Sequence, residues 1–168
     1  SGTGNINIQA QDAVQFSGFG DTGLPAFVLA QVNPDGETNA ANISIKTSRL
    51  LLGDGVNVLS TTAGNGNAGN INIDADELIE LNGGNIFGGG SSIATQVEPG
   101  GVGNAGVLTV KTKRLIMNDG AQISSTTRGN GNGGNLFINA SESVELLGLA
   151  EDGFSSRIFS QVNRGGVG

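Results

Sequence analysis

The sequence contains no cysteine, no histidine, no tryptophan and no tyrosine among its 168 residues. Without cysteine there is no thiol nucleophile, no zinc knuckle and no disulfide framework. Without histidine the chain lacks the usual acid–base group at neutral pH, which is also the commonest metal-ligating side chain. We therefore expect a protein that is not an enzyme, with no catalytic, cofactor-binding or metal-binding residues and no cofactor.

Positive charge and long apolar runs are also scarce. Eight Lys and Arg residues stand against 15 Asp and Glu residues, which gives a net charge of −7. A nucleic-acid partner requires a basic surface, so we expect no nucleic-acid binding. The chain has no run of about 18 apolar residues, so we expect no membrane span.

Glycine, in contrast, is abundant, with 30 residues. This is about two and a half times its usual share. The stretch from Ser60 to Ile73 recurs nearly intact from Ser125 to Ile138, at an offset of 65 residues and without a gap. Because such a period marks a repeat architecture, it takes precedence over predictions made element by element.

Long and short laps alternate within this period. Short alternating apolar segments begin at Ile6, Ile43, Ile71, Leu108 and Leu136, and their spacings are 37, 28, 37 and 28 residues. We place the laps at 1–40, 41–68, 69–105, 106–133 and 134–168, all within one structural segment covering 1–168. Since the chain begins and ends inside this pattern, we expect it to be part of a longer repeat array.

Each lap has three short runs of strand character separated by Gly, Asn, Asp or Pro. In the second lap these runs are Asn42–Thr47, Arg49–Leu52 and Val56–Thr62. No window has apolar residues at helical spacing. We predict an all-β parallel β-helix, a solenoid of about five laps of three short strands.

Stacked laps must place similar side chains above one another, because each lap buries the next. Matching positions do carry similar residues. Three aliphatic columns are predicted to face inward: Ile8, Ile45, Ile73, Val110 and Ile138; Val14, Leu50, Ile79, Leu115 and Val144; and Val28, Val58, Ile93, Ile123 and Ile158. The extra residues of the long laps, near 18–26, 83–91 and 148–156, form variable loops on one side, where binding is commonly found.

Several polar groups recur at the lap spacing, and structural interpretations account for them. Asn5, Asn42, Asn70 and Asn135 form a column that Val107 interrupts, and we interpret it as hydrogen-bonding turn residues. The runs 64–67 and 129–132 alternate Gly and Asn; with no following Lys-Ser/Thr pair they are connectors, mobile or tightly turned, and not phosphate loops.

The charged and hydroxyl side chains are also given structural interpretations. The acidic group Asp74, Asp76, Glu77 and Glu80 is interpreted as an exposed face, with Asp74 in one column with Lys46 and Lys111. Four turn residues are interpreted as solvated and not as calcium ligands: Asp21, Asp54, Asp119 and Asp152. The outward column Gln31, Thr61, Gln96, Thr126 and Gln161 is interpreted as hydrogen bonding along the stack. Leu51 and Ile116 face outward, which indicates either a local turn of the strand or a small apolar contact patch.

The chain resembles the repeat region of filamentous-haemagglutinin-like exoproteins of the two-partner secretion type, especially the cyanobacterial ones described as S-layer family. The resemblance covers essentially the whole chain, and its most typical segments are TKRLIMNDGAQIS at 112–124, GNGGNL at 131–136 and NASESVEL at 139–146. No part matches the family's N-terminal secretion domain, so the chain corresponds to the shaft and no family site residues transfer to it.

The resemblance implies a right-handed β-helix that is exported, secreted or extracellular, and present at the cell surface. The expected function is a structural or adhesive shaft in a surface or filament-forming protein. Expected partners are other copies of the chain, joined end to end or laterally into fibres, and a surface glycan or host-cell surface. Two alternatives remain: a carbohydrate-binding or carbohydrate-active β-helix, and an ice- or surface-binding β-solenoid.

Overall fold

Short extended segments punctuated by Gly, Asn and Asp form the regular structure of the computed structural model, which describes residues 4–21, 23–84, 90–151 and 153–163. These segments are β-strands, and no helix occurs in this part of the chain. No helix there could therefore cross a membrane. The strands are β1 (Asn5–Gln9), β2 (Ala13–Phe16), β3 (Phe27–Val32), β4 (Asn42–Leu52), β5 (Asn57–Thr62), β6 (Ile71–Leu81), β7 (Ser92–Val97), β8 (Leu108–Asn118), β9 (Gln122–Thr127), β10 (Leu136–Leu147) and β11 (Arg157–Val162).

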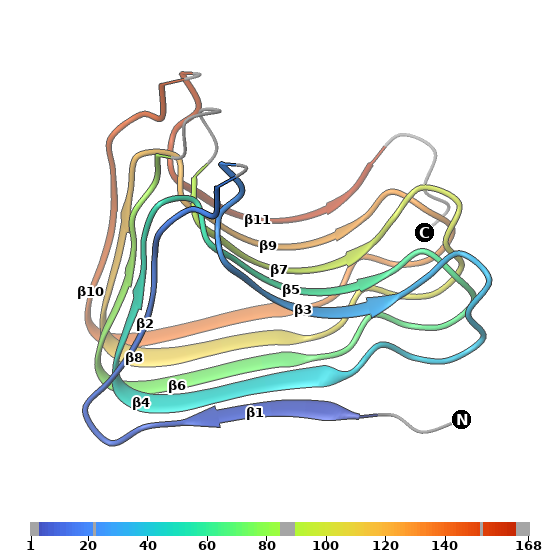
Figure 1. Cartoon of the computed structure of the whole chain (residues 1–168), viewed down its shortest axis with the longest axis horizontal. Helices are drawn as coiled ribbons and strands as arrows, with labels where there is room; N and C mark the ends of the chain where they lie inside the picture. Colours follow the sequence, from blue (N-terminus) through green and yellow to red (C-terminus); the bar gives the residue numbers. More distant parts are fainter. Residues whose placement is uncertain (1–3, 22, 85–89, 152, 164–168) are drawn as a thin grey trace.

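The strands form two parallel sheets that face each other (Figure 1). The first sheet has the order β1-β4-β6-β8-β10, and β2 also pairs with β4. The second sheet has the order β3-β5-β7-β9-β11. From β4 onward, consecutive strands alternate between the sheets, so the chain crosses from one sheet to the other and back. This is an all-β architecture of parallel strands, as expected for a parallel β-helix. Strands that are hydrogen-bonded neighbours within a sheet lie on successive levels of the stack, and we use the word level in this sense.

Two of the three predicted strands are joined into one. The predicted segments Asn42–Thr47 and Arg49–Leu52 form the single strand β4. The backbone stays extended through the corner because the N–H of Ser48 donates to the Gln11 carbonyl at 3.2 Å, and that of Arg49 donates to the Asp12 carbonyl at 3.1 Å. Figure 1 shows these long strands following the base of the molecule and then turning along its side.

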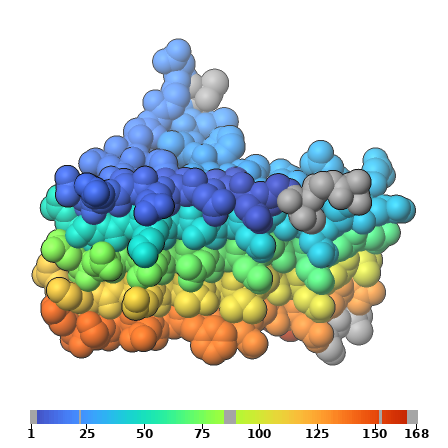
Figure 2. Space-filling model, turned by 90° about the horizontal axis from the view of Figure 1, so that it is seen from below, coloured from blue at the N-terminus to red at the C-terminus, as the bar shows by residue number. Residues whose placement is uncertain are grey.

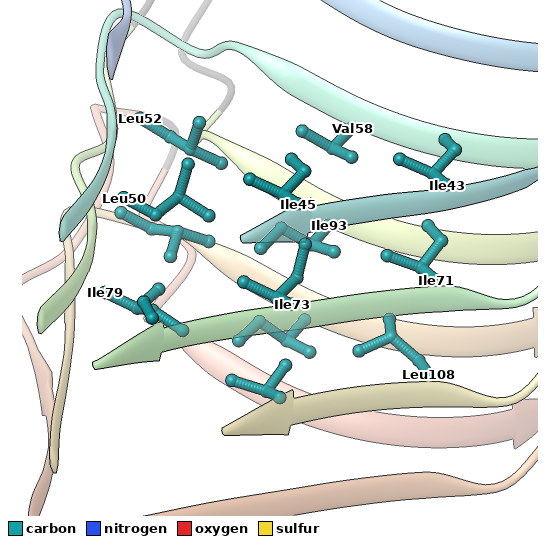
Figure 3. Close-up of a cluster of buried hydrophobic side chains, with 14 of the residues drawn as sticks. Ile43, Ile45, Leu50, Leu52, Val58, Ile71, Ile73, Ile79, Ile93 and Leu108 are labelled. Atoms are coloured by element: carbon teal, nitrogen blue, oxygen red, sulfur yellow. The ribbon is translucent and has the colours of Figure 1, made fainter. Parts of the chain in front are cut away.

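The predicted inward columns are confirmed by the strand register. Ile45 pairs with Ile8 and Ile73, which in turn pairs with Val110, and Val110 pairs with Ile138. The other two columns are likewise in register. Because successive side chains of a strand point to opposite faces, these residues enter the space between the sheets. The aliphatic side chains of these columns form one continuous core (Figure 3), except that of Val144, which is 45% exposed on the last strand of the first sheet.

Two kinds of connection join the sheets on the side where the long strands end. After β4 and β8 the connection is a tight turn, in which Asp54 and Gly55, and likewise Asp119 and Gly120, have positive φ angles. After β2 and β10 the connection is a small hairpin, closed by the antiparallel pairs Phe19–Pro25 and Leu149–Ser155. The first hairpin stands out beyond the end of the stack (Figure 2). The third predicted loop, 83–91, lies largely outside the described residues.

Candidate functional site

The predicted asparagine column joins successive levels by hydrogen bonds. Asn5 pairs with Asn42 in the strand register. The side-chain Oδ1 of Asn42 accepts a hydrogen bond from the backbone N–H of Asn70 at 2.8 Å, and Oδ1 of Asn70 accepts one from the N–H of Val107 at 2.8 Å. The hydrogen-bonding interpretation is therefore confirmed. The backbone N–H of Val107 completes the bond from Asn70, but its side chain has no oxygen to accept the N–H of Asn135, so this chain of bonds ends at Val107.

A second asparagine column, which the sequence analysis did not identify, lies three residues before the first. It contains Asn39, Asn67, Asn104 and Asn132. Oδ1 of Asn67 accepts from the N–H of Asn104 at 2.8 Å, and the same bond joins Asn39 to Asn67 and Asn104 to Asn132. Sequence signals were present, because Asn39 and Asn104 are separated by the same 65 residues as Asn67 and Asn132.

This second column includes the end of the glycine-asparagine run, which the structure shows as a stacked turn. Asn65 and Asn130 both form parallel bridges with Val102. The N–H of Gly66 donates to the Val102 carbonyl at 2.8 Å. The tightly turned alternative for the connector is therefore correct.

A groove of about 390 Å³ runs between the two columns. Its rims are exposed asparagines, and its floor contains the buried residues Ala40, Ala68 and Ala105. The rims are three residues apart, so they are separated by at most about 11 Å. None of the lining residues is charged. The groove is therefore a neutral channel directed along the stack, with mainly amide rims and buried alanines between them.

Buried hydroxyl groups hold the backbone under this groove. Oγ of Ser60 accepts from the N–H of Gly69 at 2.9 Å and donates to the Ala41 carbonyl at 3.0 Å. At the next levels, Thr95 and Ser125 donate to the Gly106 carbonyl at 2.9 and 3.1 Å. These bonds tie the second sheet to the turn that forms the groove floor. Ser60, Thr95 and Ser125 are therefore hydroxyl residues because their side chains bond the backbone of this turn.

Removal of the Ser60 hydroxyl and removal of the Thr62 hydroxyl should have opposite effects on the free energy of unfolding. Ser60→Ala is expected to lower the free energy of unfolding by about 1–3 kcal/mol, because it leaves the buried Gly69 N–H without its partner. Thr62 is fully buried and its Oγ1 has no partner among the described residues, while Val32 and Val97 occupy its column. Thr62→Val is therefore expected to raise the free energy of unfolding by about 1 kcal/mol.

Urea denaturation followed by circular dichroism measures both effects. Wild-type stability of Ser60→Ala would contradict the bridging role of this hydroxyl. A loss on Thr62→Val would show that Oγ1 has a partner, such as a buried water.

The acidic group is distributed over an exposed face. Asp74 stands in register with Lys46 and Lys111, and its Oδ1 lies 3.4 Å from Nζ of Lys111. Asp76 and Glu77 are exposed at the corner of β6, and Glu80 accepts a hydrogen bond from Asn82 at 3.1 Å. The charge-pairing interpretation of Asp74 is confirmed. Asp74 and Glu80 are only partly exposed, and a surface ion pair such as Asp74–Lys111 contributes about 0–1 kcal/mol.

The turn aspartates have individual roles in the backbone. Oδ2 of Asp54 accepts from the N–H of Gly18 at 2.8 Å, which links the tight turn to the hairpin beside it. Asp119 has the same left-handed conformation, and Asp21 is exposed in the first hairpin. Asp152 lies outside the described residues. Within the described part of the chain, no three His, Cys, Asp or Glu side chains gather as metal ligands would.

The Gln and Thr column is in register from Gln31 to Gln161, but within the described part of the chain no hydrogen bond joins its members and Oγ1 of Thr126 has no partner, so the predicted bonding along the stack is not found. Thr61 and Thr126 are each only 3% exposed. They offer almost no hydroxyl surface, which weighs against an ice-binding plane of threonines. Leu51 pairs with Gln15 and Glu80, so its strand is not locally turned, and the apolar-patch alternative is the one that remains for Leu51.

Comparisons of the chain with family models, curated proteins and solved structures gave no match.

Proposed function

We propose that the chain is a right-handed parallel β-helix with laps at 1–40, 41–68, 69–105, 106–133 and 134–168, and that it serves as the non-enzymatic shaft of an extracellular surface or filament protein. The proposal is supported above all by the register, in which each inward column continues through the stack. A shaft of this kind lengthens by adding laps, each advancing it by about 4.8 Å.

Three sets of bonds favour stiffness along the stack. The parallel sheets form one set, the asparagine columns form another, and the buried hydroxyls form the third. None of them needs a metal, a disulfide or a cofactor. The resemblance to two-partner secretion exoproteins adds the extracellular setting and the right-handed sense.

Electron microscopy of the native full-length protein from its source tests this proposal. We expect long rods or fibres of uniform width at the cell surface, and right-handed laps at high resolution. Antibodies against this segment should label intact cells. Short discrete particles, or labelling only after the cells are broken, would contradict the shaft function.

A further inference from the structure

The groove between the asparagine columns is the part of the surface with the most regular chemistry. Because Oδ1 of Asn39, Asn67, Asn104, Asn42 and Asn70 already accepts a backbone N–H, each of these side chains is held in a fixed orientation. Their Nδ2 groups donate to no protein atom among the described residues. Each amide therefore keeps two N–H donors for a ligand.

Three backbone carbonyls that border the groove already accept hydrogen bonds from the protein. The carbonyls of Asn67 and Asn70 accept from Ala40 and Ile43, both at 2.9 Å, and that of Asn104 accepts from Ala68 at 2.9 Å. The groove is thus rich in donors, while the carbonyls of Asn67, Asn70 and Asn104 are engaged. A matching ligand must supply a row of acceptor oxygens.

The floor and the charge narrow the ligand further. The alanines between the rims are only 5–8% exposed, so a ligand meets chiefly the amides of a neutral groove, and a ring with oxygens around its edge suits these donors. Since no lining residue is charged and the whole chain carries −7, a polyanion gains no attraction here. A pyranose sugar has the required combination of features.

The period of the donors favours a polymer. Levels repeat at about 4.8 Å along the stack. An extended peptide advances by about 3.3–3.4 Å per residue and so falls out of step with the amides. A linear β-1,4-linked sugar chain advances per sugar by nearly the distance between levels, so successive sugars meet the amide pairs Asn39/Asn42 and Asn67/Asn70 and then the single amide of Asn104, opposite Val107.

We propose that this groove binds a neutral, linear β-1,4-linked polysaccharide, laid along the stack with its oxygens on the amides of Asn67, Asn70 and their column neighbours. One sugar occupies each level, with its edge oxygens directed at the exposed amides. This binding is independent of the shaft function, since the same amides hold the stack together through Oδ1 and bind the sugar through Nδ2.

Titration calorimetry with cellohexaose and cellobiose tests the site. Cellohexaose spans more levels, so it is expected to bind at least about tenfold more tightly than cellobiose. Raising the salt concentration should change the affinity little, because no charge is involved. Absence of binding at millimolar cellohexaose would overturn the proposal, as would preferential, salt-sensitive binding of polygalacturonate.

A double variant and its matched control test whether the ligand binds in this groove. In the double variant Asn67→Asp with Asn70→Asp, each side chain keeps the Oδ1 acceptor that holds the next level but loses both Nδ2 donors. We expect cellohexaose to bind at least about tenfold more weakly. The control Asn7→Asp with Asn72→Asp adds the same charge at exposed positions on the first sheet and should stay within about twofold of wild type. Unchanged affinity of the groove variant would overturn the proposal.

A measurement on the wild type covers the case in which the groove variant does not fold. In nuclear magnetic resonance spectra, cellohexaose should shift the side-chain amide signals of Asn67, Asn70 and Asn104 while leaving those of Asn7 and Asn72 in place. Shifts confined to other residues would overturn the groove assignment. Neither result bears on the shaft, which microscopy tests separately.

Discussion

Ile73→Asp is expected to prevent stable folding of the chain or to lower its free energy of unfolding by at least about 4 kcal/mol. Ile73 is fully buried in the core between its column neighbours Ile45 and Val110. A carboxylate there loses its hydration and finds no cation, and the smaller side chain also leaves a cavity. Since each level buries the next, the defect lies in the middle of the stack and separates its two halves.

The matched control is the neighbouring residue in the same strand. Asn72 is exposed, so Asn72→Asp introduces the same side chain on the opposite face and should change stability by no more than about 0.5 kcal/mol. Circular dichroism during thermal and urea denaturation compares the two variants. Similar melting of Ile73→Asp and wild type would contradict the inward register of the first sheet.

The core could be predicted from the sequence because stacking imposes the same requirement at every level. Ile45, Ile73 and Val110 recur at the lap spacing, and a strand buried on one face alternates with a period of two. Together these two periods fix which residues pair and which side chains point inward. The predicted columns consequently agree with the register over both sheets.

The corner of the long strands could not be predicted in the same way. The sequence predicts a break at Ser48, between the runs Asn42–Thr47 and Arg49–Leu52, but the N–H of Ser48 continues the bonding to the neighbouring segment. Whether a backbone bends with or without losing its hydrogen bonds depends on that neighbour, which local composition does not describe. The same holds for the hairpin after β2, whose antiparallel pair Phe19–Pro25 lies within a variable loop.

Only one of the two asparagine columns that border the groove could be identified from the sequence. The column with Asn42 and Asn70 was identified because it opens the alternating segments, whereas Asn67 was assigned to a glycine-rich connector. Only the stacked turn places Asn67 beside Asn70 with the buried Ala68 between them. The predicted hydrogen bonding of these asparagines is correct for Oδ1, but the predicted turn conformation is not, because Asn5 and Asn42 belong to strands β1 and β4. The remaining Nδ2 donors can be recognised as a candidate binding site only in the structure, where both columns border one groove.

Gly103→Ala is expected to cost at least about 3 kcal/mol of unfolding free energy, although it adds a single methyl group. Gly103 has a φ of +154°, which residues with a Cβ rarely adopt. A Cβ at this position would also overlap the carbonyl oxygen of Gly66, one level away. Relief requires the levels to separate, which would stretch the adjoining bond between Asn104 and Asn67. Gly66 and Gly131 meet the same restriction, so the column keeps glycine where another level lies against it.

Gly20→Ala is the control, because it makes the same change in the first hairpin. A Cβ on Gly20 would lie 3.9 Å from the Leu24 carbonyl oxygen, an ordinary contact. The second hairpin already has alanine there, since Ala150 donates its N–H to Phe154 just as Gly20 donates to Leu24. We expect Gly20→Ala to stay within about 0.5 kcal/mol of wild type in urea denaturation. Equal stability of the two variants would mean that the levels are spaced more widely at Gly103, and that the groove beside it has a different shape.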